Sequence, residues 1–221
     1  NNIKKENTIY RLFEILEKKK ILNNNKFQVK IKKNIPQEAG LGGGSMNAAT
    51  ILNYLIKKNF IKITQKKVLQ IAKLIGSDVI LGINPSSAIL SSNGVVKQFL
   101  KTPRFNILLV HPNFGCSTKK IYSAVRKFRK PVLNNPKKNM MNLKYLLKYE
   151  NDLEIIAFSK YQKLKIIKSF LEDLNQPLFV RMTGSGSVMV AYYQKKQDCE
   201  LAKVRFKRKF KNYWCNTSKT I

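Results

Sequence analysis

Four glycines fall within the five residues 40–44 of the stretch "IPQEAGLGGGSMNAAT", residues 35–50. The residues that follow directly favour a helix, since Ala48, Leu52 and Leu55 form an apolar stripe at helical spacing. The first amides of a helix have no intrahelical partner, and the helix dipole makes that end positive. Glycines let an anion approach these amides without meeting a Cβ. The stretch therefore predicts a phosphate-binding loop rather than a flexible connection.

The two most familiar nucleotide-binding motifs do not fit this loop. A Walker loop places Lys-Ser/Thr after its last glycine, whereas Gly44 is followed by Ser45 and Met46. A dinucleotide-binding fingerprint reads Gly-x-Gly-x-x-Gly, and Ser45 stands where its last glycine belongs. The loop is thus predicted to belong to another class of phosphate-binding protein.

The apolar periodicity along the chain predicts an α+β protein with a break near residues 97–104. Thr64 and Ser117 stand where they can cap helices. Residues 76–90 are predicted as a loop that leads into a strand. The remaining helices are predicted at 9–16, 48–56, 65–75, 117–128, within 140–174 and after residue 193, and the strands at 27–31, 105–110, 178–182, 187–193 and 213–215.

The formal net charge of +31 would attract phosphate-rich partners, including nucleic acids. The lysines are nevertheless spread along the whole chain, and the densest basic stretch, Lys203–Lys211, alternates with apolar residues. Asn and Ile are also abundant, which indicates a compositional trend rather than a selected basic surface. We therefore expect no nucleic-acid partner.

Composition also bears on the compartment and on metals. No apolar run approaches the roughly 20 residues that span a bilayer, so no membrane partner is expected. Residues 1–20 lack the apolar core of a signal peptide, and we expect a cytoplasmic protein. Three cysteines without CxxC spacing predict reduced thiols and no zinc site. No residue is predicted to bind a metal directly, and the sequence leaves the oligomeric state open.

Residues 36–49, "PQEAGLGGGSMNAA", resemble the phosphate loop of the GHMP kinase superfamily, Pro-x-x-x-Gly-Leu-Gly-x-Gly/Ser-Ser-x-x-Ala. The triple glycine before Ser-x-Asn-Ala-Ala is similar to the loop of the 4-diphosphocytidyl-2-C-methyl-D-erythritol kinases, a family of the non-mevalonate isoprenoid pathway. The resemblance extends over nearly the whole chain, in the family's order, through "ENTIYRLFEIL" (6–16), "GSDV" (76–79), "ENDLE" (150–154) and "RMTGSGSVMVA" (181–191).

This resemblance implies a two-domain fold, with the ATP-binding domain in residues 1–100 and the second domain in residues 101–221. It implies transfer of the ATP γ-phosphate, with Mg²⁺, to the 2-hydroxyl of a cytidine-diphosphate-linked methylerythritol. Asp78 matches the catalytic base, although an Asx-turn or helix cap is an open alternative for it. The loop residues that would bind ATP are Pro36, Gln37, Glu38, Ala39, Gly40, Leu41, Gly42, Gly43, Gly44, Ser45 and Met46.

The resemblance also assigns lesser roles. The turn "TGSG", residues 183–186, lies near the active site in the family, and an ordinary tight turn is the alternative. Asn151 and Asp152 are predicted as a structural N-cap pair. Thr118 stands where the family often has a threonine near the substrate, and His111, at the end of an apolar strand, is predicted to be structural.

Some family features are not in the sequence. The family opens with a strand that carries Lys-x-Asn and with a Gly-Tyr-His segment, and the sequence contains neither this opening strand nor the Gly-Tyr-His segment. We therefore expect the start of the first domain to be missing and catalysis to be incomplete. Glu38 takes a position that is commonly glycine, and Met46 replaces a frequent serine. Another GHMP kinase, of the homoserine or mevalonate type, and a basic RNA-binding module on a related fold are the alternatives.

Overall fold

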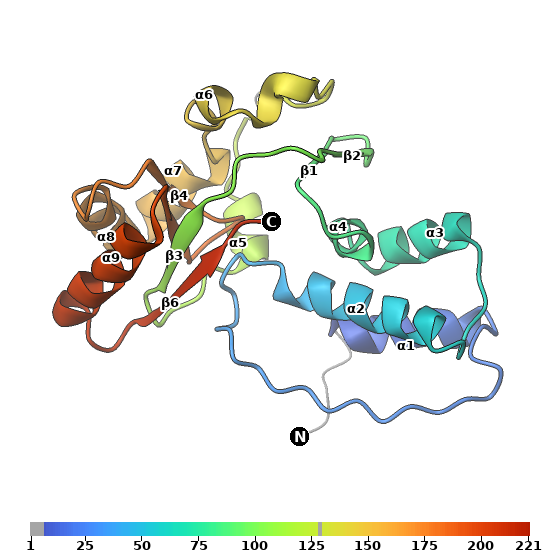
Figure 1. Cartoon of the computed structure of the whole chain (residues 1–221). Coiled ribbons are helices and arrows are strands. Elements are labelled where there is room, and N and C mark those ends of the chain that lie inside the picture. Colours follow the sequence, from blue (N-terminus) through green and yellow to red (C-terminus); the bar gives the residue numbers. More distant parts are fainter. Residues whose placement is uncertain (1–6, 128–129) are drawn as a thin grey trace. The chain divides into compact units, whose positions relative to one another are not determined.

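A computed structural model describes residues 7–127 and 130–221, which form two compact units (Figure 1). The first unit contains the described residues up to Lys32, together with Gly42–Leu100 and Pro131–Pro136. The second contains Lys33–Leu41, the described residues of Lys101–Lys130, and Lys137–Ile221. The chain thus passes from the second unit into the first between Leu41 and Gly42, inside the glycine loop. The mixture of helices and antiparallel sheet confirms the α+β class.

The first unit is mainly helical. Asn7 and Thr64 accept hydrogen bonds from the first turns of α1 and α3, as expected of N-cap residues. The apolar stripes of these helices and of α2 meet in one core around Leu12, Leu52 and Ile71. The elements of the first unit are α1 (Thr8–Lys18), α2 (Gly43–Lys57), α3 (Gln65–Ile75), α4 (Val79–Ile83), β1 (Ala88–Leu90) and β2 (Val96–Gln98).

The second unit is built on a four-stranded antiparallel sheet of order β4-β5-β3-β6. Alternate side chains of β5 point to opposite faces, so Met189 and Ala191 join the core beneath α7, α8 and α9, while Val190 lies on the other face (Figure 1). The elements are β3 (Asn106–His111), α5 (Thr118–Tyr122), the 3₁₀ helix η1 (Lys138–Met141), α6 (Leu143–Leu146), α7 (Asp152–Lys160), α8 (Gln162–Glu172), β4 (Phe179–Met182), β5 (Met189–Tyr193), α9 (Lys196–Lys209) and β6 (Trp214–Lys219).

Three local predictions were wrong. Residues 27–31 alternate in burial but form no ladder with another described segment, and Phe27 packs against the rings of Phe13 and Phe60 instead. A strand needs a neighbour to pair with, and alternation alone does not supply one. Residues 79–83 form the short helix α4 where a loop was predicted. Helix α5 ends at Tyr122, earlier than predicted, and Phe128 lies outside the described residues.

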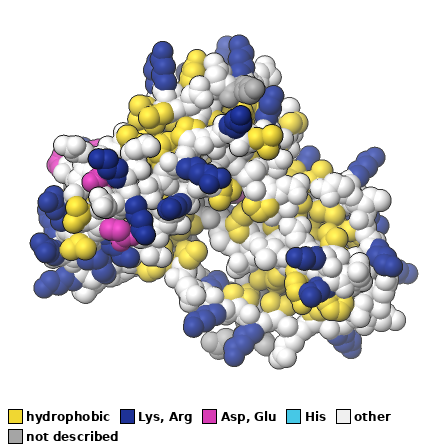
Figure 2. Space-filling model, in the orientation of Figure 1, with side chains coloured by type: hydrophobic (Ala, Val, Ile, Leu, Met, Phe, Trp, Pro, Cys, Tyr) yellow, Lys and Arg dark blue, Asp and Glu magenta, His cyan; other side chains and the backbone are white. Residues whose placement is uncertain are grey.

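The surface carries its positive charge in a dispersed way. Figure 2 shows Lys and Arg side chains scattered over the visible face of both units, between apolar and uncharged side chains. Among the described residues, no helix combines the length and the apolar composition needed to cross a bilayer.

Candidate active site

The first turn of α2 presents bare backbone amides. Gly42 caps the helix in the left-handed conformation, with φ of 64° and no side chain to accept a hydrogen bond. The amides of Gly43, Gly44 and Ser45 find no acceptor among the described residues, whereas Met46 N donates to Gly42 O at 3.0 Å. The three glycines are exposed, and the first turn has no acidic residue. The positive end of the helix is therefore open to an anion.

Packing does not explain why glycine stands at two of these positions. A Cβ added at Gly42 or Gly43 would have no atom of a neighbouring segment within 4 Å. Gly42 needs its positive φ, but Gly43 is an ordinary helical residue that alanine would stabilise by up to about 1 kcal/mol. The open space at these positions fits the close approach of a ligand to the backbone.

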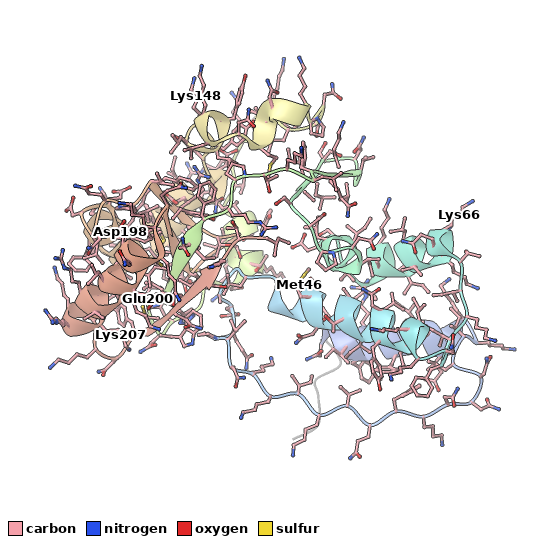
Figure 3. All side chains as sticks on the ribbon, in the orientation of Figure 1. Met46, Lys66, Lys148, Asp198, Glu200 and Lys207 are labelled. Carbon is pink, nitrogen blue, oxygen red and sulfur yellow. The ribbon has the colours of Figure 1, made fainter. Side chains whose placement is uncertain are left out.

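Asp78 belongs to the same compact unit as this helix start. It precedes α4, which packs against α2 so closely that a Cβ on Gly82 would lie 2.7 Å from Ala49 Cβ and 3.0 Å from Met46 Sδ. Figure 3 labels Met46 at the start of α2, on the side of α4. Asn53 of α2 also donates to Ile83 O at 2.9 Å. Two contacts thus hold α4, and the aspartate before it, on α2.

The Asp78 side chain does not serve as a helix cap. It stands at the N-cap position of α4 but makes no capping hydrogen bond, and its backbone is helical rather than extended. Its Oδ1 instead accepts from Ser77 Oγ at 3.0 Å, and the residue is exposed. The carboxylate therefore faces solvent with accepting capacity left over.

Residues 38–41, the first half of the glycine loop, lie on the face of the sheet that points away from α7, α8 and α9. Ala39 is buried against Val188 and Val190, and Leu41 packs beside it. Backbone hydrogen bonds fix the same segment, because Ser187 N donates to Glu38 O and Val188 N donates to Ala39 O, both at 3.2 Å.

Gly40 is pressed against the turn 183–186. Thr183 Oγ1 donates to Gly40 O at 3.1 Å. An added Cβ at Gly40 would lie 2.1 Å from Thr183 O and 2.9 Å from Gly186 N, and φ at Gly40 is +70°. Two glycine-rich stretches that are far apart in sequence therefore meet backbone to backbone, which only glycine at position 40 allows.

Comparisons with known proteins identify the family. The model of the GHMP kinases N terminal domain matches residues 7–90. The "4-diphosphocytidyl-2-C-methyl-D-erythritol kinase" of Pelagibacter ubique (strain HTCC1062) is 56% identical over 220 residues, which cover 100% of this chain and 78% of the relative. The chain belongs to the 4-diphosphocytidyl-2-C-methyl-D-erythritol kinase family. The resemblance inferred from the motifs is thereby confirmed.

More distant members of the family point the same way. The 4-diphosphocytidyl-2-C-methyl-D-erythritol kinase of Petrotoga mobilis (strain DSM 10674 / SJ95) is 34% identical over 194 residues, covering 83% of this chain and 74% of the relative. A crystal structure of 4-(cytidine 5'-diphospho)-2C-methyl-D-erythritol kinase superposes with a TM-score of 0.77 at 23% identity, covering 100% of this chain and 81% of that chain. The latter likeness confirms the two-domain fold of GHMP kinases.

Glu38 departs from the family's usual glycine but keeps the backbone that a glycine favours. Its φ is +50°, in the left-handed region. Its carboxylate side chain lies over Gly115, where an added Cβ would be 2.4 Å from Glu38 Cβ. The loop of this kinase family member is therefore retained despite the substitution, with Gly115 providing the room for the larger side chain.

Other residues singled out in the sequence have local roles. Thr118 Oγ1 shares a hydrogen bond of 2.9 Å with Ser185 Oγ in the turn 183–186. His111 is buried, which lowers its pKa, and its Nδ1 accepts from Asn113 N. Burial, assisted by the Glu38 carboxylate, raises the pKa of Cys116 to about 11, so this thiol stays protonated near neutral pH.

The sequence located the loop but not the groups that hold it. Cys116, Ser187 and Val188 bind the Glu38–Ala39 backbone through their main-chain amides, and such contacts leave no side-chain signature. Pro36–Leu41 lie in the second unit, whereas Gly42–Met46 and Asp78 lie in the first.

Proposed function

We propose that this chain transfers the γ-phosphate of ATP to the 2-hydroxyl of 4-diphosphocytidyl-2-C-methyl-D-erythritol. The observation that carries the proposal is the bare start of α2, where three amides without a partner among the described residues follow an exposed glycine cap. The relative that is 56% identical bears the name of this kinase, which supports the choice of substrate over homoserine or mevalonate.

In this proposal the residues Pro36–Met46 bind ATP. The amides of Gly43, Gly44 and Ser45 neutralise phosphate oxygens through hydrogen bonds and the helix dipole. The Ser45 hydroxyl adds a contact at the same end of the helix. Phosphoryl transfer depends mainly on positioning and on charge neutralisation, and the amides at the start of α2 would supply the neutralisation.

Asp78 acts in this proposal as the general base that takes the proton from the attacking hydroxyl. Its exposed carboxylate, free of a capping role, supports this assignment over a structural one. General-base catalysis needs an ionised carboxylate within hydrogen-bond reach of the hydroxyl. A carboxylate that already neutralised a helix end would perform the task less well.

The proposed metal is Mg²⁺ carried by the phosphates of ATP. Within residues 7–127 and 130–221, no group of three or more His, Cys, Asp or Glu side chains gathers that could hold a metal ion. Mg²⁺ in kinases keeps waters and phosphate oxygens as ligands and takes few from the protein. The Ser45 hydroxyl is the protein group that we propose near it.

The proposal is tested by offering the purified chain ATP with each of three alcohols. We expect slow but measurable phosphorylation of 4-diphosphocytidyl-2-C-methyl-D-erythritol, because the family's opening Lys-x-Asn strand and Gly-Tyr-His segment are not in the sequence. We expect none of homoserine or mevalonate above the rate without an acceptor. The Pelagibacter ubique relative, assayed beside it, calibrates the signal. Phosphorylation of one of the other two alcohols, or of none, would contradict the proposal.

A further inference from the structure

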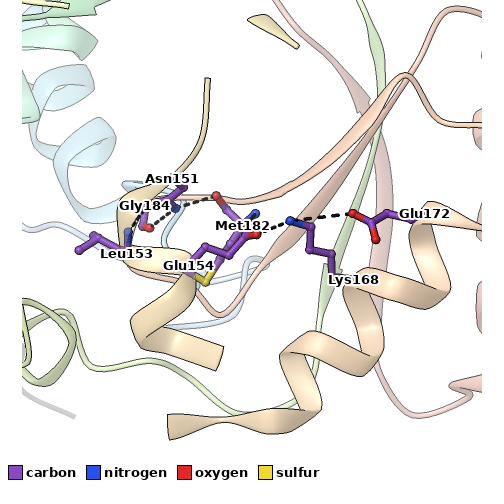
Figure 4. A network of polar contacts seen from close by, with 7 residues as sticks. All are labelled: Asn151, Leu153, Glu154, Lys168, Glu172, Met182 and Gly184. Carbon is purple, nitrogen blue, oxygen red and sulfur yellow. Dashed lines mark hydrogen bonds and ion pairs between the residues drawn. The ribbon is translucent and has the colours of Figure 1, made fainter. Parts of the chain in front are cut away.

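One side chain on α7 performs two tasks. Asn151 is the N-cap of the helix, since its Oδ1 accepts from Leu153 N at 3.0 Å. Its Nδ2 faces the opposite way and donates to Met182 O at 2.9 Å and to Gly184 O at 2.7 Å (Figure 4). The capping role was expected from the sequence, and the second role was not.

The same helix turn holds the amide side of Met182. Glu154 is buried, and its Oε2 accepts from Met182 N at 2.8 Å. Its Oε1 pairs with Lys168, which also approaches Glu172 (Figure 4). The first turn of α7 thus binds Met182 through both its N–H and its C=O, and it reaches Gly184 as well.

The turn 183–186 needs such external support. Its sequence is Thr-Gly-Ser-Gly, and Gly184 and Gly186 adopt φ of +52° and +85°. Glycines lose more conformational freedom on folding than other residues, so contacts from outside must compensate. Asn151 supplies two hydrogen bonds to carbonyl groups at this turn and just before it.

The turn 183–186 determines the position of the Gly40 backbone. Thr183 Oγ1 bonds Gly40 O, and a Cβ on Gly184 would lie 2.8 Å from that same oxygen. With so little space, the turn cannot shift without moving Gly40. Two residues later the chain reaches Gly42, the cap of α2.

We propose that Asn151 is a positioning residue for the ATP loop: through the turn 183–186 it sets the backbone of Gly40, in the part of the loop that lies in the second unit. This inference rests on the proposed function, in which Pro36–Met46 bind ATP. Asn151 does not touch the nucleotide and acts through Met182, Gly184 and Gly40.

The variants Asn151→Asp and Asn151→Ser separate positioning from capping. Both residues cap helices as well as Asn does. Asp has no donor when ionised, and the single short hydroxyl of Ser cannot replace an amide that bonds two carbonyls. We expect the Kd and KM for ATP to rise about tenfold or more in both variants, the equivalent of two lost hydrogen bonds. The KM for the acceptor alcohol should change little, whereas the melting temperature should fall by a few degrees because the turn loses the same two bonds.

Thr64→Asp is the matched control. Thr64 caps α3 in the first unit, so the variant adds the same charge at a helix start without touching the turn. We expect its Kd for ATP to equal that of the wild type. Amide hydrogen exchange measures the stability of the loop contacts without an activity assay. The relevant amides are Ser187 N and Val188 N, which donate to Glu38 O and Ala39 O of the loop. Their exchange should accelerate in the Asn151 variants while the amides between β3 and β6 stay protected.

The outcomes are distinct. Variants that bind ATP as the wild type does would overturn the positioning role and leave the proposed function intact. If Thr64→Asp weakened ATP binding equally, the effect would be one of charge, which also overturns the role. A wild-type chain that fails to bind ATP would contradict the proposed function itself and, with it, this inference.

Discussion

Replacing Gly40 with alanine is expected to destabilise the second unit and to lower kinase activity together. The new Cβ would meet the carbonyl oxygen of Thr183 at 2.1 Å, and this oxygen is backbone that cannot rotate away. Overpacking of this kind and a non-glycine residue at φ of +70° together cost about 3 kcal/mol. Displacement of the loop by about 1 Å would lower kcat/KM by about 100-fold. Urea unfolding and steady-state kinetics measure the two effects.

Gly94→Ala is the control that isolates the contact with the turn. Gly94 has φ of +76°, close to that of Gly40, but an added Cβ would meet only the flexible end of Lys73, at 3.8 Å. This variant should lose about 1–2 kcal/mol from backbone strain and keep full activity. Equal losses of stability and of activity in the two variants would show that the contact between Gly40 and the turn does not matter.

Replacing Asp78 with asparagine is expected to lower kcat by about 10²–10⁴-fold, the usual contribution of a general base. Asparagine has nearly the same shape but cannot accept the proton. The carboxylate makes no capping bond in α4, so folding should be unaffected. The KM for ATP should also stay near its wild-type value, because the amides of α2 rather than Asp78 are proposed to bind the phosphates.

Asp173→Asn provides the control for the loss of a carboxylate. Asp173 is exposed at the C-terminal end of α8, in the second unit. Its neutralisation should leave kcat unchanged. Wild-type kcat in Asp78→Asn would show that Asp78 is not the base. A loss of activity that is explained by unfolding of the variant, seen as a melting temperature below that of the assay, would also contradict the assignment.

The sequence predicts correctly those parts of the fold that depend on interactions between residues close together in the chain. The predicted caps at Thr64, Ser117 and Asn151 are each observed, because a side-chain oxygen near a helix start has few better partners. The hairpin of β4 and β5 around the turn 183–186 is also observed. These features depend on residues only a few positions apart.

The sequence-based predictions fail where the structure depends on contacts between residues far apart in the chain. Residues 27–31 have the alternation of a strand, but pairing depends on a neighbour that a pattern cannot reveal. The glycine loop is visible in the sequence, but its division between two units after Leu41 depends on the sheet that receives Ala39. For Asn151 the sequence predicts the helix cap, which is a local interaction. It does not predict the hydrogen bonds to Met182 and Gly184, which span more than 30 residues.

The central claim is that the amides at the start of α2 bind the phosphates of ATP. Amide NMR spectra of the ¹⁵N-labelled chain, recorded during titration with ATP, test it directly. We expect the resonances of Gly42, Gly43, Gly44 and Ser45 to shift most and to saturate together. ATP binding that leaves these four resonances unchanged, and that shifts amides elsewhere in the chain, would contradict the claim.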